Sequence, residues 1–345
     1  MIEPAPLLLL DDPLYLSHEP GGGHPESSGR LRAIQARLAA SPIAGARAVI
    51  PAPAPREAIA RVHSPGHLDA LDALRGEARW VTPDTGVSAG SVPAIESAAG
   101  AAIAAVDAVV KGEARRAFAL VRPPGHHAKR DRMMGFCFVN NIAVAAAHAR
   151  AVHGLTRVLI VDWDVHHGNG TESIFFTDPG VLVFDSHQSP LYPGTGELDS
   201  AGAGEGRGYT VNLPLPAETG DGDLLGLYRE LLTPIAEAFR PELILVSAGF
   251  DGHRDDPLGG FALTDEGFAG LCGLVTALAD RLCGGRLCLF LEGGYDHDAL
   301  ARSVHACGEV LVGRAPPPAP AMSARGEGLL KIFREFHRRR WPTLG

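Results

Sequence analysis

The sequence predicts an α/β protein: a single domain with an open, mainly parallel β-sheet and helices on both faces. Three observations favour this fold. Hydrophobic residues make up 46% of the 345 positions, which is enough for one large core. Short apolar runs alternate with longer helical patterns along most of the chain. Polar clusters directly follow four of these runs, as ligand-binding loops do at the carboxyl ends of parallel strands.

Six apolar runs are expected to form the parallel strands. Each run is short, apolar throughout and bounded by turn residues, which is typical of strands that are covered on both faces. The six runs are Leu7–Leu10, Phe118–Val121, Val158–Val161, Val181–Phe184, Leu243–Val246 and Leu287–Leu291.

Helical patterns lie between and after these strands. A Pro-rich stretch precedes the last of them, which ends in three arginines. We therefore expect a main domain over residues 1–314, then a linker and a C-terminal helix over 315–345 that packs on or beside it. That helix is also a candidate interface for a homo-oligomer. The expected helices are Ala94–Val110, Asn141–Val152, Leu224–Phe239, Asp265–Leu282, His297–Val312 and, after Ala315–Pro320, Glu327–Arg340.

Composition excludes several classes of partner. The net charge of −9 opposes binding to nucleic acid or to anionic membranes, although it permits a cationic substrate. No apolar run approaches the roughly 20 residues that span a bilayer. The N-terminus lacks the basic region and the length of a signal peptide. Five cysteines without C-x-x-C spacing indicate a reducing, cytoplasmic compartment.

The four polar clusters follow the apolar runs that end at 121, 161, 246 and 291. Because the carboxyl ends of parallel strands meet at one edge of a sheet, the clusters are candidates to converge on one site. They are Arg122–His127, Asp162–Gly170, Ser247–Pro257 and Glu292–Tyr295.

A metal site is the most specific prediction from these clusters. Asp162, Asp164 and His166 alternate along an extended segment, so their side chains lie on one side of it. Asp256, after another strand, completes a set of two carboxylates and one imidazole with Asp164 and His166. Such a set leaves a coordination position open for water, as catalytic zinc sites do. Turn and capping residues are the competing interpretation of each motif alone, but together the motifs favour a metal.

The histidine pair His126-His127 follows Pro-Pro-Gly, which forms a rigid turn. Rigid placement suits general acid–base catalysis, where small displacements are costly. Five other histidines receive no role. Three of them fall in helical patterns and two are expected at the surface: His148, His153 and His305, and His63 and His67.

Together these motifs resemble the histone deacetylase superfamily, which includes acetylpolyamine amidohydrolases and acetoin-utilisation proteins and has the arginase/deacetylase fold. The resemblance extends from about residue 15 to residue 312. Phe250, Asn169 and the Asp-Pro-Leu-Gly-Gly motif resemble the class II branch in particular. The matching stretches are His24–Glu26 with Arg30, Arg122–His127, Gly135–Asn141, Val161–Gly170, Tyr192–Gly194, Ser247–Gly260 and Leu291–Tyr295.

The resemblance implies that residues 1–314 are a deacetylase catalytic domain with one catalytic zinc ion on Asp164, His166 and Asp256. It implies that His127 is the general base and then the general acid. His126 would be its electrostatic partner, oriented by Asp162.

Two further residues complete the catalytic set. Asn169 stands where the class I branch has an aspartate behind the second histidine, so His127 is expected to be less basic here. Tyr295 would donate a hydrogen bond to the developing oxyanion.

The resemblance also implies a substrate channel. Phe136 and Tyr192 would form its walls, and Gly135 would lie beside the substrate chain, where a Cβ leaves no room. Asp84 resembles the rim aspartate that accepts hydrogen bonds from the substrate. Leu258 stands where the polyamine-specific branch of animals has an acidic gatekeeper, which counts against strict polyamine specificity.

Monovalent cations, usually potassium, are expected at one or two further sites by the same resemblance. The first site would use Asp162, backbone oxygens of Asp164 and His166, and atoms near Asp185 and Ser186. The second would use oxygens near Phe175, Asp178, Val181 and Tyr209.

The expected activity is zinc-dependent hydrolysis of an acyl amide on lysine or on a small amine. Three alternatives stay open. They are an acetylpolyamine-specific amidohydrolase, an arginase-like hydrolase with two manganese ions, and a catalytically silent protein that binds acylated amines. Tyr295 weighs against the silent protein, because binding alone needs no oxyanion donor.

Overall fold

The computed structural model describes residues 5–345. In this part of the chain one eight-stranded sheet has the order β2-β1-β5-β10-β9-β6-β7-β8, and all its paired strands are parallel. The predicted parallel α/β fold is therefore confirmed. The strands are β1 (Ala5–Leu10), β2 (Ala46–Val49), β5 (Ala114–Ala119), β6 (Val158–Asp162), β7 (Val181–Gln188), β8 (Thr210–Leu215), β9 (Leu243–Ala248) and β10 (Leu287–Leu291).

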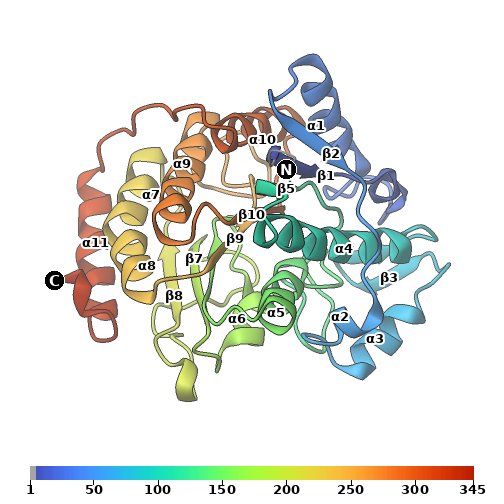
Figure 1. Cartoon of the computed structure of the whole chain (residues 1–345), viewed down its shortest axis with the longest axis horizontal. Helices are drawn as coiled ribbons and strands as arrows, with labels where there is room; N and C mark the ends of the chain where they lie inside the picture. Colours follow the sequence, from blue (N-terminus) through green and yellow to red (C-terminus); the bar gives the residue numbers. More distant parts are fainter. Residues whose placement is uncertain (1–4) are drawn as a thin grey trace.

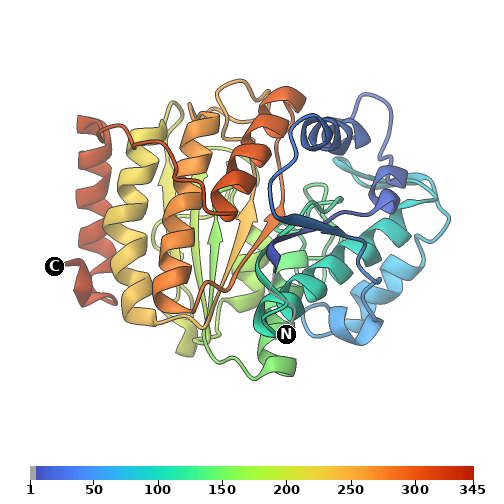
Figure 2. The same ribbon diagram turned by 45° about the horizontal axis from the view of Figure 1, so that its top comes forward.

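Helices cover both faces of this sheet (Figure 1). α4, α5 and α6 lie on one face, while α1, α10, α9, α7 and α8 line up across the other (Figure 2). The long helices are α1 (Ser28–Ala40), α4 (Ser91–Val110), α5 (Asn141–His153), α9 (Asp265–Leu282), α10 (His297–Leu311) and α11 (Ala324–His337). The short ones are α2 (Arg56–Ile59), α3 (Pro65–Asp72), α6 (Asn169–Phe175), α7 (Asp221–Leu227) and α8 (Thr233–Phe239).

The strands that the sequence did not predict include both edges of the sheet. β2 is largely exposed, and β8 contains Asn212 and Pro214. An edge strand has one unpaired side, so it tolerates proline and needs no continuous apolar run. A small antiparallel pair, β3 (Arg79–Thr82) and β4 (Thr85–Val87), was also not predicted.

Helix starts follow the capping residues in the sequence. The side chains of Asn140, Thr264 and Asp296 each accept a hydrogen bond from a backbone N–H in the first turn of α5, α9 and α10. These caps fix where the helices begin. The expected bounds of these three helices therefore agree with the structure to within one residue at each end.

α4 corrects one expectation. It is long and apolar enough to pass for a membrane span by length and composition, although no such run was expected. However, 72% of its most apolar stretch is buried inside the domain, against β5 and α5. It is the central helix of one sheet face.

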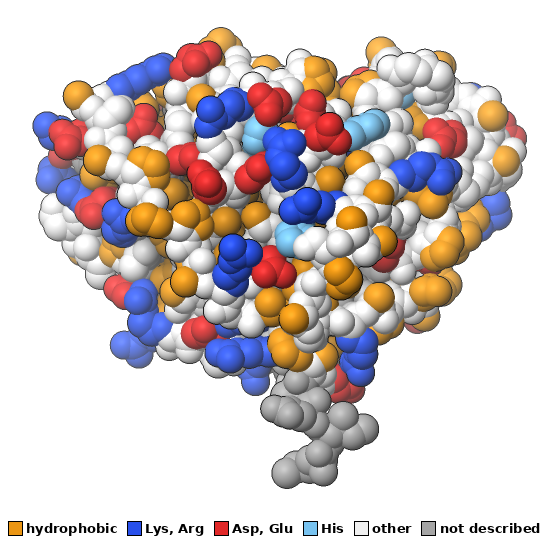
Figure 3. Space-filling view, turned by 90° about the horizontal axis from the view of Figure 1, so that it is seen from above, with side chains coloured by type: hydrophobic (Ala, Val, Ile, Leu, Met, Phe, Trp, Pro, Cys, Tyr) orange, Lys and Arg blue, Asp and Glu red, His pale blue; other side chains and the backbone are white. Residues whose placement is uncertain are grey.

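The C-terminal segment packs on the domain. The proline-rich linker crosses α9, where Pro316 lies against Gly273, and α11 packs on α7. Beyond α11, the Trp341 indole donates a hydrogen bond to the carbonyl of Gly208, at 3.0 Å. All five cysteines are free and buried. On the face above α1, α9 and α10, acidic and basic side chains are interspersed (Figure 3).

His63 and His67 were expected at the surface, and this is wrong. Both are buried, with their rings stacked at 4.3 Å. His63 bonds the carbonyl of Lys129 at 3.0 Å and accepts a hydrogen bond from the backbone N–H of Asn140, also at 3.0 Å. The pair therefore anchors the long loop between β5 and α5 through hydrogen bonds to its backbone.

Burial lowers the pKa of His63 to about 3, against 6.5 for an ordinary histidine. Between pH 6.5 and 3, His63 therefore binds a proton in the unfolded chain and stays neutral in the folded chain. The contribution to stability is complete above pH 6.5 and is lost as the pH falls, by up to about 1.4 kcal/mol per pH unit. We expect His63→Gln to flatten the pH dependence of the unfolding free energy, measured by urea denaturation from pH 6.5 to 4.5. An unchanged slope would contradict this assignment.

Candidate active site

Sheet order brings the four polar clusters together. They follow β5, β10, β9 and β6, and these four strands are consecutive neighbours in the centre of the sheet. Since the strands are parallel, their carboxyl ends open on one edge. Within the sheet, Asp162 at the end of β6 is level with Ser247 on β9 and Asp185 on β7. The expected convergence on one site is therefore a property of the fold.

Three potential metal ligands lie at this edge. Asp164, His166 and Asp251 place one ligand atom each within 4.8 Å of one another. His166 Nδ1 is 3.2 Å from Asp164 Oδ1 and 3.1 Å from Asp251 Oδ2. The other oxygen of Asp164 accepts a hydrogen bond from the backbone N–H of Gly293, at 2.8 Å. The first two ligands that the sequence proposed thus lie together, whereas Asp251 was missed.

Asp256, the third ligand proposed from sequence, is not part of this cluster. Its carboxylate accepts hydrogen bonds from the backbone N–H groups of Tyr295 at 2.6 Å, Asp296 at 3.3 Å and Leu258 at 2.9 Å. These bonds join the Asp256 loop to the loop of Tyr295. Asp256 is near enough to Asp251 for its charge to help raise the pKa of that carboxyl.

The electrostatics of the cluster fit a divalent cation. Burial, with the charge of Asp164, raises the pKa of Asp251 to about 7. Burial opposes a charge on His166, but its hydrogen bonds with Asp164 and Asp251 outweigh this and raise its pKa to about 10. Protons are thus drawn to the site because buried carboxylates outnumber cations there. Oxygen and imidazole ligands with excess negative charge are the donor set that zinc takes in hydrolases.

The two adjacent histidines have different partners. His126 Nδ1 is 3.0 Å from Asp162 Oδ2, and His127 Nδ1 is 2.9 Å from Asn169 Oδ1. Despite burial, the charges of Asp164 and Asp162 raise the pKa of His126 well above its usual range. Burial and the neighbouring charge of His126 hold the pKa of His127 well below it. The surroundings thus favour the cationic form of His126 and the neutral form of His127.

Tyr295 lies on the loop after β10 and faces the same edge. Burial and the charge of Asp251 raise the pKa of its hydroxyl well above 10, so the hydroxyl keeps its proton. The guanidinium of Arg30 lies 5.1 Å from its ring centre. Phe136 meets the other side edge-on, at 5.9 Å. Tyr295 is therefore held as a hydrogen-bond donor between a cation and an aromatic wall.

A buried ion cluster joins the loops that carry His126 and Tyr295. Glu26 Oε1 accepts hydrogen bonds from Arg122 Nε at 2.6 Å and from Arg30 Nη1 at 3.2 Å, and all three side chains are fully buried. Arg30 in turn donates to the carbonyls of Glu292 at 2.5 Å and Gly294 at 2.6 Å. Burial would raise the pKa of Glu26, but Arg122, His18 and Arg30 together outweigh it and hold that pKa well below the usual range.

Glu292 makes a second connection between the same loops. Its Oε2 accepts hydrogen bonds from the backbone N–H groups of Gly125 at 2.7 Å and His126 at 3.1 Å. Sequence reasoning quoted Glu26, Arg30 and Glu292 as matching residues but gave them no role. Only Glu292 carried a signal in the sequence, because it directly follows the apolar run Leu287–Leu291 and a buried charge requires a partner. Glu26 and Arg30 stand in a polar, glycine-rich segment that gives no such signal.

The backbone is strained at the two residues predicted to form the channel wall. Gly135 and Phe136 both have positive φ, of 58° and 68°, and such a φ is unfavourable for a bulky residue like phenylalanine. The backbone N–H of Phe136 donates to Thr85 Oγ1 at 3.1 Å. A Cβ on Gly135 would lie 2.4 Å from the ring of His127. Gly135 therefore lies directly against the ring of His127, whereas the substrate channel itself stays a prediction.

The other residues predicted for the channel lie beside His127 and Asp256. Tyr192 is 39% exposed, and its ring centre is 5.1 Å from that of His127. Asp84 accepts hydrogen bonds from Thr82 at 2.5 Å and Thr85 at 2.8 Å, and it also bonds the Tyr192 hydroxyl. Leu258 is half-buried beside Asp256. The carboxylate of Asp84 is thus anchored by three side chains, one of which is the partly exposed phenol of Tyr192.

The residues proposed for monovalent cations are divided between two places. Near Asp162, its carbonyl faces the Ser186 hydroxyl at 3.4 Å, while Asp185 bonds His187 Nδ1 at 2.7 Å. Around the loop before β7, the carbonyls of Phe175, Asp178 and Tyr209 accept hydrogen bonds from Asp178, Val181 and Val183. In that loop the Asp178 carboxylate pairs with Arg150.

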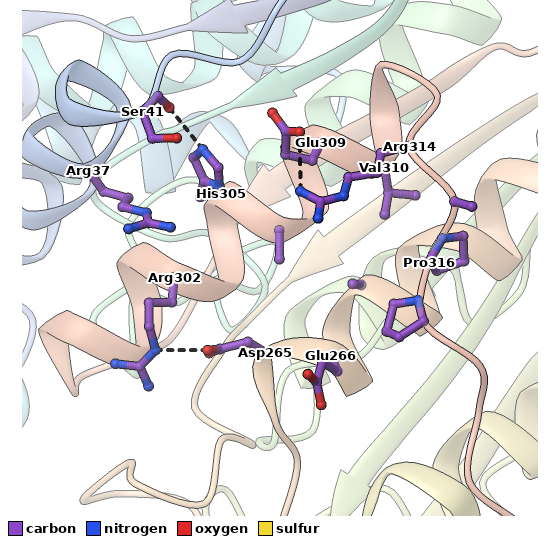
Figure 4. Close-up of a pocket in the computed structure, with 14 residues that line it drawn as sticks. Arg37, Ser41, Asp265, Glu266, Arg302, His305, Glu309, Val310, Arg314 and Pro316 are labelled. Carbon is purple, nitrogen blue, oxygen red and sulfur yellow. Dashed lines mark hydrogen bonds and ion pairs between the residues drawn. The ribbon is translucent and has the colours of Figure 1, made fainter.

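A separate cavity of about 530 Å³ lies between α1, α9 and α10 (Figure 4). No residue predicted for the active site lines it. Arg302 bonds Asp265 at 2.8 Å and Arg314 pairs with Glu309 at 3.6 Å, so these charges are neutralised within the chain. We therefore place the active site at the strand ends and not in this cavity.

Comparison with known proteins agrees with the fold and with the sequence motifs. The sequence profile described as "Histone deacetylase domain" matches residues 24–311. The chain belongs to the histone deacetylase family. Its structure is similar to the crystal structure of the HDA15 HD domain, with a TM-score of 0.91, 37% identity and coverage of 98% of this chain and 96% of that chain. The arginase/deacetylase fold and the hydrolase class expected from the sequence are thereby confirmed.

Similar proteins in the family carry names of more than one activity. A "Probable deacetylase" of Archaeoglobus fulgidus is 40% identical, over 81% of this chain and 79% of that protein. A "Histone deacetylase-like amidohydrolase" of Pseudomonas aeruginosa is 36% identical, over 93% and 86%. Human "Polyamine deacetylase HDAC10" is 43% identical, over 79% of this chain but only 43% of its own length. All three names describe removal of an acyl group from an amine or hydrolysis of an amide, and they differ in the substrate that they mention.

We expect Glu26→Gln to destabilise the fold by about 3–5 kcal/mol, because it leaves two buried guanidinium groups without their carboxylate. Urea denaturation measures this loss. Arg56→Gln is the matched control, since it removes exposed ion pairs worth less than about 1 kcal/mol. Equal losses for the two variants would show that the cluster of Glu26, Arg30 and Arg122 does not hold the fold together.

Proposed function

We propose that this protein is a zinc-dependent deacylase that hydrolyses the amide between an acyl group and a primary amine. One observation carries the proposal most directly. The compact set of Asp164, His166 and Asp251 lies beside two differently partnered histidines and a protonated tyrosine. Hydrolysis of an unactivated amide needs an electrophile for the carbonyl, a base for water and a donor for the oxyanion.

Asp164, His166 and Asp251 are the proposed zinc ligands, in place of the set with Asp256 that the sequence suggested. Asp251 Oδ2 lies 3.1 Å from His166 Nδ1, and the three side chains hold one ligand atom each within 4.8 Å of one another. Both carboxylate oxygens of Asp256 instead accept hydrogen bonds from backbone N–H groups, those of Leu258, Tyr295 and Asp296. Asp256 therefore has a supporting role, because it joins its own loop to the loop of Tyr295. Two carboxylates and one imidazole leave a coordination position open, as catalytic zinc sites do.

When bound, zinc supplies Lewis acidity, which polarises the acyl carbonyl and lowers the pKa of water from 15.7 toward about 7. The protein groups manage the protons. Because Asn169 Oδ1 accepts the proton of His127 Nδ1, Nε2 is left free to take a proton from the attacking water. Tyr295 donates its hydroxyl proton to a hydrogen bond with the developing oxyanion. His127 then returns the proton to the leaving amine.

Asn169 sets the strength of this base. A neutral amide orients the imidazole through the same hydrogen bond as a carboxylate would, but it adds no negative charge behind the ring. His127 consequently stays neutral in a site that already contains the cationic partner His126. Asp162, bonded to His126, supplies the compensating charge on the other ring.

The proposed substrate is a linear acyl amine that enters between Phe136 and Tyr192. Gly135 leaves room for its alkyl chain, because a side chain there would collide with His127. Asp84 at the rim accepts hydrogen bonds from the part of the substrate outside the channel. Leu258 presents an apolar side chain, so recognition of an internal ammonium group by that position is not expected. Acyl-lysine and short acylated amines therefore fit better than long polyamines.

The competing activities differ in their requirements. A two-manganese site would need further bridging carboxylates and histidines, whereas here His126 and His127 each bond a partner of their own. A binding protein without activity would need no donor at the position of Tyr295. We also propose that one or two potassium ions bind near Asp162 and in the loop before β7, and that the enzyme works in the reducing cytoplasm, where its buried thiols stay reduced.

We expect Tyr295→Phe to fold normally, to retain zinc, and to lose turnover by about 100- to 1,000-fold, because one oxyanion donor is removed. The assay is hydrolysis of acetyl-lysine peptides, acetylputrescine, acetylcadaverine and longer acyl chains, measured side by side with and without a chelator. Full activity in Tyr295→Phe would refute its role. Absence of turnover by the zinc-loaded wild type on every substrate would favour the binding protein.

Asp256→Asn and Asp251→Asn distinguish the two candidates for the third ligand. We expect Asp251→Asn to remove zinc at stoichiometric concentration. We expect Asp256→Asn to weaken zinc binding by only about 10- to 100-fold, as loss of a supporting hydrogen-bond partner does. Metal content after dialysis and zinc titration measure both. The reverse order would make Asp256 the ligand.

A further inference from the structure

A second group of metal-ligating side chains lies far from the active site. Asp107 on α4 and His148 and His153 on α5 place one ligand atom each within 4.8 Å of one another. Both imidazoles direct Nε2 at the same atom, Asp107 Oδ1, at 2.8 Å for His148 and 2.7 Å for His153. The three donors therefore already converge.

This arrangement has the chemistry of a zinc site. Two imidazole nitrogens and one carboxylate oxygen are borderline-soft and hard donors of the kind that bind late divalent metals, zinc among them. Burial lowers the pKa of His148, so its ring is neutral and able to bind a metal. Asp107 and His153 are partly exposed, which leaves access for the ion and for a water ligand.

Two cationic side chains, Lys111 and Arg61, lie beside the cluster and would repel a metal ion unless they leave its ligand atoms free. Lys111 bonds Asp107 at 2.9 Å, but through Oδ2, so Oδ1 stays available and the lysine fixes the carboxylate from its other oxygen. Arg61 lies 3.4 Å from His148 Nδ1, where a metal-bound neutral imidazole would carry its proton. Arg61 is exposed and its contact is long, so its side chain can turn into solvent.

The cluster is independent of the catalytic centre. Asp107 lies near the end of α4, just before β5 begins, and His153 ends α5 before β6 begins. Both positions are at the amino-terminal edge of the sheet, whereas the catalytic loops leave its carboxyl edge. The two sites are thus separated by about a strand length, roughly 17–20 Å.

We propose that Asp107, His148 and His153 form a second, structural zinc site that fastens α4 to α5. These helices pack on each other and cover β5, β10 and β9, three neighbouring strands in the centre of the sheet, from one side. A metal that bridges them stabilises the layer on which the catalytic loops are built, because it binds the folded chain and not the unfolded one. The alternative is an ion-pair network of Asp107 with its two histidines and Lys111.

Zinc titration by calorimetry, with metal content by mass spectrometry, tests the proposal on the full chain. We expect two zinc ions per wild-type chain, one in Asp164→Asn, one in His153→Gln, and none in the double variant. Zinc should raise the melting temperature of Asp164→Asn, and His153→Gln should abolish that increase. If the catalytic proposal fails instead, wild type holds one ion, which His153→Gln removes and Asp164→Asn does not.

Two matched variants sharpen the test. Asp107→Asn should lose the second zinc, whereas Asp69→Asn, which removes a carboxylate from an exposed ion pair without histidines, should keep it. Arg61→Glu should tighten binding by up to about tenfold, because it offers an acceptor to His148 Nδ1–H. A second zinc that persists in His153→Gln, or its absence from Asp164→Asn, would overturn the proposal and leave the ion-pair network.

Discussion

The pairing of Glu26 with Arg122 and Arg30 is the constraint on which the active site depends. One buried carboxylate holds two guanidinium groups, one at the start of the loop of His126 and His127 and one beneath the loop of Tyr295. A buried charge is tolerated only when it is paired, so neither loop can move without exposing its partner to an apolar interior. His127 and Tyr295, the proposed base and the proposed oxyanion donor, therefore keep their relative positions although they lie far apart in the sequence.

The candidate metal site is also governed by the need of buried charges for partners of opposite sign. Acidic residues from three loops meet where the central strands end, and few cations accompany them. Protonation of Asp251 and His166 relieves this excess charge in the protein alone, and a divalent cation would relieve it more fully. The carboxylates that would bind a cation therefore repel one another in the protein alone and destabilise the folded chain. The ion cluster around Glu26 and the hydrophobic sheet offset this destabilisation.

Asn169, Tyr192 and Phe136 surround the proposed base and the proposed entrance for substrate. Asn169 leaves His127 with a hydrogen bond but without a neighbouring charge. Tyr192 adds a phenol that bonds Asp84 at the rim. The unfavourable backbone of Phe136, held by Thr85, shows that this wall is fixed by its surroundings and not by local preference.

The sequence by itself determined the parallel α/β class, the central strands and the family, because buried strands need continuous apolar runs and the family's polar motifs follow them directly. It also identified Asp164, His166, His126, His127 and Tyr295 as a set. Only the tertiary structure decided which strands are neighbours, that Asp251 and not Asp256 joins Asp164 and His166, and that Asp107 meets His148 and His153. Edge strands escaped prediction because they need no continuous apolar run. Buried histidines and supporting ion pairs escaped it because their partners come from segments distant in the chain, and no local pattern records such a contact.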